Sequence, residues 1–172
     1  YHGWHDWYLS ANLGETDNLD GHLLPGLAPS GVPRGLKGTA LPFKFNRIED
    51  LENIVRKHGD QLAAVTMEPT RTLEPEPGFL ERVRELADQC GAVLVFDEIT
   101  IGLRLGLGGS HLIYGVNPDL AVFGKSLGNG FPMAAVIGTA DVMSAAEGSF
   151  ISSSYWTDGI GPTAALATLR KA

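Results

Sequence analysis

The stretch Asp119-Leu-Ala-Val-Phe-Gly-Lys125-Ser-Leu-Gly-Asn-Gly130-Phe-Pro132 decides how the rest of the chain is interpreted. An apolar run, Leu120 to Phe123, stops at Gly124, and Lys125 follows before further glycine, asparagine and proline residues. Short apolar runs bounded by turn residues are typical of buried strands. The pattern therefore predicts that Lys125 lies where a buried strand meets a loop. A lysine in a partly dry pocket there can act as a nucleophile, and a surface lysine in a glycine-rich loop is the alternative.

Helical and strand patterns alternate in the middle of the chain, before this stretch. In chain order, the predicted elements are a helix over 47–58, a strand over 62–67, a helix over 80–90 and a strand over 92–96. Strands that alternate with helices, without a tight hairpin signal between them, are typical of a mostly parallel sheet. The sequence therefore predicts an α/β fold.

Local signals predict how two helices begin and how a third one packs. Asn46 and Glu49 have the spacing of a capping box at the start of the first helix. Pro162 is expected to open an alanine-rich helix over 163–171, at the first helical position. Cys90 falls on the apolar face of its helix, so we expect a packing thiol rather than a nucleophile.

The composition narrows the classes of function. The chain has 172 residues with 44% hydrophobic and 19% charged residues, which suits one globular unit with a core. The formal net charge of -7 and the lack of a Lys/Arg run argue against a nucleic-acid partner. No apolar run is long enough for a membrane helix, and a single cysteine fits a cytoplasmic setting. Because the chain opens without Met, inside a motif, we expect an internal fragment.

Three charged residues follow predicted strands. Glu68, Asp97 and Lys125 each stand at the end of an apolar run. Carboxyl ends of parallel strands share one edge of a sheet, and ligands bind there, so we expect these side chains on one rim. A lysine amine can hold an aldehyde cofactor as a Schiff base, and a buried carboxylate can keep a pyridine nitrogen protonated. The alternative is that each is an ordinary loop charge.

The first residues of the chain are rich in aromatic and imidazole groups. Tyr1, His2, Trp4 and Trp7 lie within one short segment with His5. Such rings can form an aromatic wall for a flat ligand, and a packed domain edge is the equal alternative. Two histidines three residues apart could also ligate a metal, but no second ligand cluster accompanies them, so we predict no metal site.

Four motifs together resemble one enzyme family. They are Tyr1-His-Gly-Trp-His-Asp6, Phe96-Asp-Glu-Ile99, Gly124-Lys-Ser-Leu-Gly128 and Ser153-Ser-Tyr-Trp-Thr157. In this order and spacing they resemble the class III aminotransferases of PLP fold-type I, nearest to the glutamate-1-semialdehyde aminomutase-like branch. The resemblance implies a three-layer α-β-α core with a mostly parallel sheet. It implies that 1–172 is part of the large PLP-binding domain, with the small domain absent.

The resemblance also implies roles for residues around a pyridoxal 5'-phosphate cofactor. Lys125 matches the Schiff-base lysine, which also moves a proton during the reaction. Asp97 matches the carboxylate paired with the pyridine nitrogen. Tyr1 matches the aromatic residue stacked on one face of the ring, and Ile99 matches the aliphatic residue on the other face. His2 belongs to the first motif and supports this cofactor site.

Further matches concern the partner subunit and the substrate. Thr157 matches a threonine that binds the cofactor phosphate of a neighbouring subunit, which implies a homodimer. Glu68 matches an acidic residue near the substrate pocket. Thr100 departs from the family, because many members have a glutamine there that reaches the cofactor's phenolic oxygen. The changes around Thr100 and after Lys125 suggest a side branch.

The implied activity is transfer of an amino group from an amino donor to a carbonyl acceptor, as in an aminotransferase or an aminomutase. Two alternatives remain at this point. One is another enzyme on the same fold, such as a decarboxylase or racemase, which would share the lysine and aspartate but not the opening motif. The other is a truncated chain that binds no cofactor, because removing packed elements exposes apolar surface.

Overall fold

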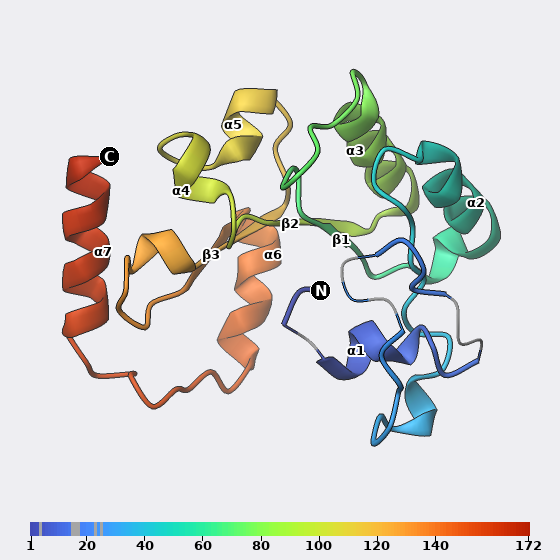
Figure 1. The fold of residues 1–172 in the computed structure, drawn as a ribbon, viewed down its shortest axis with the longest axis horizontal. Helices are drawn as coiled ribbons and strands as arrows, with labels where there is room; N and C mark the ends of the chain where they lie inside the picture. The colour runs from blue at the N-terminus through green and yellow to red at the C-terminus, as the bar shows by residue number, and fades with distance from the viewer. Residues whose placement is uncertain (4, 15–17, 23, 25) are drawn as a thin grey trace. The chain divides into compact units, whose positions relative to one another are not determined.

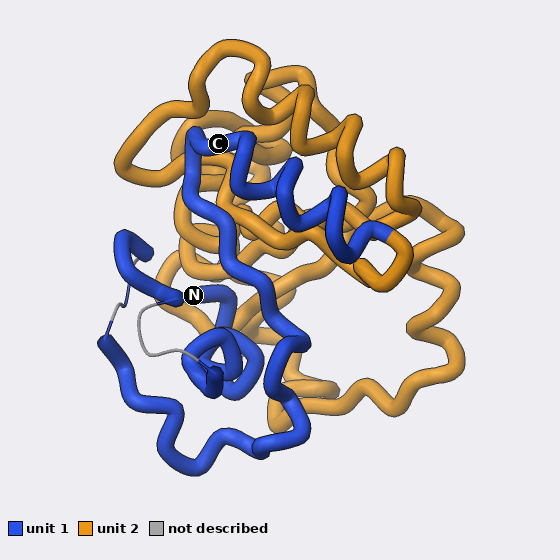
Figure 2. Tube along the Cα trace, turned by 90° about the vertical axis from the view of Figure 1, so that its right-hand side faces the viewer, with its two compact units in different colours: residues 1–59 blue, residues 60–172 orange. Residues whose placement is uncertain are grey.

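The computed structural model describes residues 1–3, 5–14, 18–22, 24 and 26–172. The chain forms two compact units, residues 1–59 and residues 60–172, coloured blue and orange in Figure 2. In the part of the chain that the structure describes, no helix has the length and apolarity needed to cross a membrane.

The first unit, residues 1–59, is mostly irregular. Its helical elements are α1 (His5–Ser10), the 3-10 turn η1 (Arg34–Leu36) and α2 (Ile48–His58). A small apolar cluster holds its irregular segments together; its buried members are Leu9, Ala11, Leu19 and Val32. The predicted helix over 47–58 is confirmed as α2, which buries Leu51 and Val55.

The predicted capping box of α2 is wrong. Arg47 is the N-cap residue and makes no side-chain capping hydrogen bond. Asn46 has a left-handed backbone with φ of 59°, so the chain turns one residue before the cap position. Instead, Asp50 Oδ2 accepts a hydrogen bond from the backbone N–H of Lys44 at 3.3 Å. The acid of the first turn therefore satisfies a donor outside the helix, and Asn46 serves as the turn residue.

The second unit, residues 60–172, is built on a four-stranded sheet with the order β1-β2-β3-β4. Its strands are β1 (Ala64–Met67), β2 (Val93–Asp97), β3 (Leu120–Phe123) and β4 (Ala135–Gly138). The pairs β1–β2 and β2–β3 are parallel, and β4 runs antiparallel to β3. The prediction of an α/β fold with a mostly parallel sheet is confirmed by this topology.

Helices connect and flank these strands (Figure 1). They are α3 (Phe79–Cys90), α4 (Gly102–Leu105), α5 (Ser110–Tyr114), α6 (Ala140–Met143) and α7 (Ile160–Lys171). The predicted helix over 80–90 is confirmed as α3. The helices α4 and α5 were not predicted, because four and five residues are too few to show a helical period.

The expected start of the last helix is wrong by two residues. The helix α7 begins at Ile160, so Pro162 occupies its third position rather than its first. The first four N–H groups of a helix have no intrahelical acceptor, so a proline at the third position loses no hydrogen bond. The backbone N–H of Thr163 then makes the first regular bond, to the carbonyl oxygen of Gly159 at 3.1 Å.

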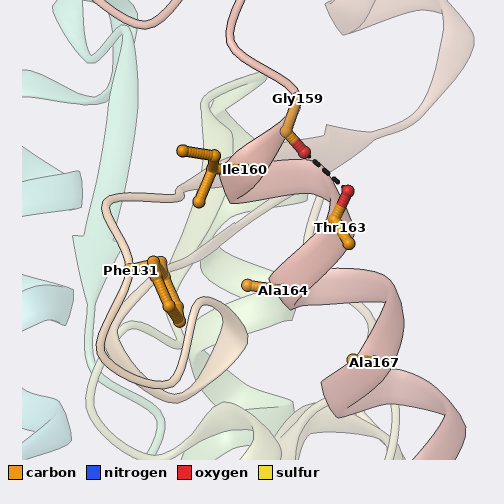
Figure 3. Close-up of a pocket in the computed structure, with 6 residues that line it drawn as sticks. All are labelled: Phe131, Gly159, Ile160, Thr163, Ala164 and Ala167. Atoms are coloured by element: carbon orange, nitrogen blue, oxygen red, sulfur yellow. Dashed lines mark hydrogen bonds between the residues drawn. The ribbon is translucent and has the colours of Figure 1, made fainter.

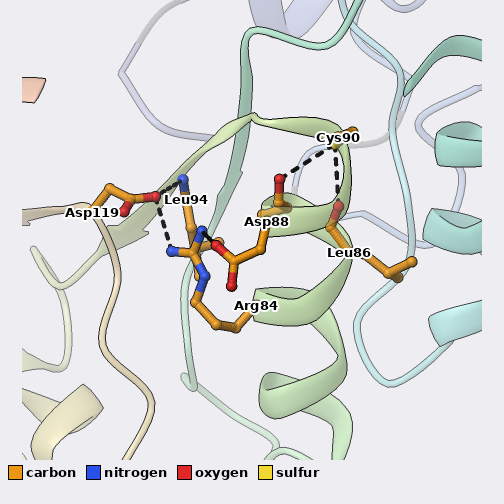
Figure 4. Close-up of polar contacts among 7 residues, drawn as sticks. Arg84, Leu86, Asp88, Cys90, Leu94 and Asp119 are labelled. Carbon is orange, nitrogen blue, oxygen red and sulfur yellow. Dashed lines mark hydrogen bonds and ion pairs between the residues drawn. The ribbon is translucent and has the colours of Figure 1, made fainter. Parts of the chain in front are cut away.

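A polar network ties α3 to the sheet at the amino ends of the strands (Figure 4). Arg84 Nη1 donates to Asp119 Oδ2 at 2.9 Å, and the same oxygen accepts from the backbone N–H of Leu94 at 2.7 Å. Burial lowers the pKa of Arg84, but hydrogen bonds to Asp119 and Asp88 outweigh that effect and raise it overall. Asp119 thus joins a helix and two strands at the end of the sheet opposite the charged rim.

Cys90 closes the last turn of α3. Its side chain is half-buried, and its Sγ donates to the carbonyl oxygen of Leu86 at 3.1 Å (Figure 4). The thiol is therefore a local hydrogen-bond donor as well as a packing group. Gly91 ends the helix with φ of 68°, and its N–H reaches the carbonyl oxygens of Ala87 and Asp88. A left-handed glycine after the last turn is a common helix end.

Candidate active site at the carboxyl edge of the sheet

The parallel strands bring the predicted charged residues to one edge. Glu68 directly follows β1, Asp97 ends β2, and Lys125 lies two residues after β3. The register pairs Met67 with Phe96 and Asp97 with Val122, so these strands end at nearly the same level. In open α/β sheets this edge is where ligands bind.

Asp97 is a buried carboxylate at this edge, with 6% of its surface exposed. Its Oδ1 accepts a hydrogen bond from the backbone N–H of Ile99 at 3.0 Å. A charge at this depth needs hydrogen-bonding partners, and the tight turn after β2 supplies one. The turn therefore orients the carboxylate as well as stabilising it.

Lys125 opens the 3-10 turn η3 (Lys125–Leu127) and has φ of 42°, in the left-handed region. Non-glycine residues seldom adopt this backbone, and such residues concentrate at functional sites. Its Nζ donates to Thr100 Oγ1 at 2.8 Å. The lysine side chain is exposed, as in the alternative of a surface lysine in a glycine-rich loop. The lysine thus reaches from the end of β3 to the turn after β2.

Sequence reasoning missed Glu98, the acid beside Asp97. Its side chain has no exposed surface, and both carboxylate oxygens are occupied. Glu98 Oε2 accepts from the backbone N–H of Ser110 at 3.1 Å and from Ser110 Oγ at 2.9 Å. Glu98 Oε1 accepts from the backbone N–H of His111 at 2.9 Å and lies 2.9 Å from His111 Nδ1. An imidazole that carries a proton on Nδ1 would complete this set of donors.

Glu98 therefore anchors the segment 98–111 to the end of β2. Two glycines allow the close packing that this requires. A Cβ atom at Gly102 would lie 2.9 Å from the Phe123 ring, and one at Gly109 would lie 2.7 Å from His111 Nδ1. The only signal in the sequence was the pair of adjacent acids, which does not reveal which one turns inward.

The other predicted site residues of the second unit are Ile99, Glu68 and Thr157, and they differ in their burial and contacts. Ile99 is half-buried, and its Cγ2 is 3.4 Å from where a Cβ atom of Gly124 would stand. It therefore packs beside the backbone that leads into Lys125. Glu68 Oε2 forms an ion pair with Arg71 Nη1 at 3.3 Å. Thr157 lies in an exposed turn that precedes α7, so its role in phosphate binding stays a prediction.

The predicted aromatic residues belong to the first unit. Tyr1 packs edge-on against Tyr8, with ring centroids 5.6 Å apart and an interplanar angle of 87°. Tyr1 and His2 are both exposed. Trp4 of the opening motif lies outside the described residues. The role of this segment in cofactor binding stays a prediction.

An apolar cavity lies elsewhere in the second unit (Figure 3). Its volume is about 440 Å³, and its walls are Phe131, Gly159, Ile160, Thr163, Ala164 and Ala167. The Thr163 hydroxyl makes an internal contact, because its Oγ1 donates to the carbonyl oxygen of Gly159 at 2.7 Å. None of the charged rim residues lines this cavity.

The residues at the rim fit a pyridoxal cofactor. An exposed lysine amine can bond to a carbonyl group, and a buried carboxylate can pair with a ring nitrogen. Ile99 offers an aliphatic surface beside them. A ring that carries both an aldehyde and a basic nitrogen matches this set of groups.

Comparisons with known proteins agree with this chemistry. Residues 35–172 match the model of the family "Aminotransferase class-III". The chain is 34% identical to 3-aminobutyryl-CoA aminotransferase of Cloacimonas acidaminovorans over 98% of its own length and 38% of that protein. It is 40% identical to glutamate-1-semialdehyde 2,1-aminomutase of Ignicoccus hospitalis over 83% of its own length and 34% of that protein.

Solved structures are similar too. A structure described as a transaminase with PLP bound superimposes with a TM-score of 0.84 at 30% identity, over 99% of this chain and 41% of that one. An omega-transaminase from Sphaerobacter thermophilus gives a TM-score of 0.75 at 36% identity, over 83% of this chain and 34% of that one. These likenesses confirm the predicted fold. The chain spans between 34% and 41% of the length of these relatives.

Proposed function

The chain belongs to the class-III aminotransferases, and from this premise we propose that the protein transfers an amino group from an amino donor to a carbonyl acceptor, with pyridoxal 5'-phosphate as cofactor. One observation carries the proposal. A buried Asp97 ends β2 and an exposed Lys125 follows the neighbouring parallel strand β3, and the lysine amine donates to Thr100 in the turn after Asp97. Family membership supports the same chemistry.

When bound, pyridoxal phosphate supplies a carbonyl that condenses with amines and a ring that accepts an electron pair. Asp97 holds a proton at the ring nitrogen, and its bond from Ile99 keeps the carboxylate in place. Lys125 binds the cofactor through its amine. When that amine is not joined to the cofactor, it would be the base of this chain that moves a proton at the substrate Cα.

The other assignments are proposals that the resemblance supports. Tyr1 covers one face of the cofactor ring, and Ile99 covers the other. His2 supports Tyr1, and Glu68 faces the substrate. A cytoplasmic location is the corresponding proposal for the cell, and the free thiol of Cys90 is compatible with it.

We also propose a homodimer in which Thr157 binds the cofactor phosphate of the partner subunit. The segment that carries Thr157 displays large apolar side chains to solvent, with Phe150 exposed by 96% and Trp156 by 67%. Large exposed apolar patches are typical of protein–protein interfaces. Light scattering of the purified protein tests this directly. A protein that is monomeric and binds the cofactor equally well with and without the Thr157 hydroxyl would contradict the proposed homodimer.

The proposed function is tested by cofactor capture. Purified protein is mixed with pyridoxal phosphate, its visible absorbance is followed, and borohydride then fixes the bound group for mass spectrometry. We expect a new absorbance band and a pyridoxyl mass on the peptide that contains Lys125. Lys125→Ala should show neither. A pyridoxyl mass only on other lysines, or no band in the parent protein, would overturn the proposal.

A screen with the same purified protein would identify the amino donor. Loss of the cofactor band upon addition of an amine reports the first half-reaction, and a panel of amines identifies the donor. The names of two relatives suggest two arms of the panel, a 3-aminobutyryl thioester and glutamate 1-semialdehyde. A single compound that completes both halves of the reaction would indicate an aminomutase.

A further inference from the structure

The amine of Lys125 is bonded to a residue to which no role has been assigned. Its Nζ donates to Thr100 Oγ1 at 2.8 Å, across a sequence separation of 25 residues. This distance is typical of a good hydrogen bond from an amine to a hydroxyl. The bond connects the end of β3 to the turn after β2, which also carries Asp97.

The backbone on the Thr100 side is held from both directions. The backbone N–H of Gly102 donates to the carbonyl oxygen of Glu98 at 2.8 Å, which closes a turn around Thr100. Glu98 is anchored by its buried carboxylate, and Gly102 packs against the ring of Phe123. Thr100 is itself half-buried. The position of its hydroxyl is therefore set by a packed turn rather than by a loose loop.

The backbone on the Lys125 side is also held. The backbone N–H of Leu127 donates to the carbonyl oxygen of Gly124 at 2.9 Å, and that of Asn129 donates to the carbonyl oxygen of Lys125 at 3.0 Å. The long lysine side chain would still sample many rotamers, whose loss costs up to about 2 kcal/mol. A hydrogen bond at the end of the side chain selects among them.

We propose that Thr100 is a positioning residue for Lys125. The Thr100 hydroxyl holds the lysine amine toward the Asp97 turn whenever that amine is not joined to the cofactor. This inference rests on the proposed function and adds a residue to the same site. A hydroxyl accepts from an ammonium group and donates to a neutral amine, so it can hold the lysine in either protonation state. An aliphatic side chain of the same shape can do neither.

Two steps depend on where the free amine lies. One is the first capture of the cofactor by the empty site, and the other is proton movement after a donor has released the lysine. Both need the amine near the reacting carbon, and misplacement of a reacting group slows such steps strongly. Binding of the donor itself does not use the free amine, so its KM should respond less than kcat.

The test compares Thr100→Val with Thr100→Ser. Valine keeps the shape and removes the hydroxyl, whereas serine keeps the hydroxyl. Cofactor capture is followed in a stopped-flow mixer, and borohydride fixation with mass spectrometry confirms that the group is on Lys125. We expect Thr100→Val to slow capture and to lower kcat by about tenfold, the equivalent of one hydrogen bond of about 1.4 kcal/mol. Thr100→Ser should restore both to within about twofold of the parent, which a purely structural role for the methyl group would not do.

A matched control uses the same substitution on α7. Thr163→Val also removes a hydroxyl that makes one hydrogen bond, and its capture rate should match that of the parent. If Thr100→Val lowers the thermal midpoint, Thr100→Ala removes the hydroxyl with less bulk and carries the comparison. Capture by Thr100→Val or Thr100→Ala at the parental rate would overturn the inference while leaving the proposed function intact. Failure of the parent to label Lys125 at all would instead overturn the proposed function.

Discussion

Glu98 Oε1 lies 2.9 Å from the backbone N of His111 and 2.9 Å from its Nδ1, and the Glu98 side chain has no exposed surface. One carboxylate oxygen thereby contacts both the backbone and the side chain of His111. The acid immediately before it in the chain, Asp97, ends β2 and remains at the edge where Lys125 lies. The two adjacent acids thus differ in their surroundings: Glu98 anchors the segment 98–111, and Asp97 lies at the edge of the sheet.

Replacing Glu98 by glutamine should destabilise the fold. An amide offers one acceptor oxygen where four donors converge, and its NH₂ group faces N–H groups that it cannot bond. Leaving buried donors unpaired costs about 1–3 kcal/mol each, and we expect a loss of about 3 kcal/mol in the free energy of unfolding in urea. Glu85→Gln is the matched control, because Glu85 pairs with Arg82 at the surface. Its effect should stay below about 1 kcal/mol. Equal losses in the two variants would contradict the anchoring role.

Gly102→Ala should disturb the site through packing alone. The added Cβ would lie 2.9 Å from Phe123 Cδ1 and 3.1 Å from Glu98 Cβ, so the segment after β2 must shift. Overpacking of this kind costs about 1–3 kcal/mol. We expect a lower thermal midpoint together with slower cofactor capture by Lys125. Gly148→Ala serves for comparison, since a Cβ there has no neighbour within 4 Å. Unchanged capture by Gly102→Ala would show that the segment adjusts without moving Thr100.

Asp97→Asn separates cofactor binding from proton abstraction. Lys125 is unaltered, so the pyridoxyl mass should still be found on its peptide after borohydride. A neutral amide cannot keep the ring nitrogen protonated, and we expect the donor half-reaction to slow by a factor on the order of a hundred or more. Rapid mixing with a single donor measures this step without turnover. A half-reaction near the parental rate would refute the role proposed for Asp97.

His22 should make the stability of the first unit sensitive to acid. Burial, followed by the positive charge of Lys44, lowers the pKa of His22 below its ordinary value of 6.5, against a smaller opposing effect of Asp50. Well above pH 6.5 the imidazole is neutral in both the folded and the unfolded chain. As the pH falls below 6.5, the unfolded chain takes up a proton first, so stability is lost.

The measurement is urea unfolding at about pH 7.5 and at about pH 5.5, one on each side of the ordinary pKa of histidine, on the parent and on His22→Gln. The variant lacks this titration, so its loss of stability between the two conditions should be smaller than that of the parent. Identical losses would mean that His22 titrates alike in the folded and the unfolded protein.

Local sequence determined much of the fold. The apolar runs that became β1, β2 and β3 and the helical periods of α2 and α3 were all predictable, because these signals repeat within a few residues. The turn residues after each strand also placed Glu68, Asp97 and Lys125 at strand ends. The four spaced motifs indicated the family, which the match over residues 35–172 then confirmed.

Tertiary structure alone decided which side chains meet. Thr100 and Lys125 are 25 residues apart, and Glu98 reaches residues 12 and 13 positions along the chain. No local sequence pattern predicts these side-chain contacts, because they arise from the packing of one strand end against another. The same packing turned Glu98 inward and left Asp97 at the edge, although the two acids are indistinguishable by spacing. The stretch around Lys125 thus specified a lysine at a strand end, and the fold supplied the hydroxyl that holds its amine.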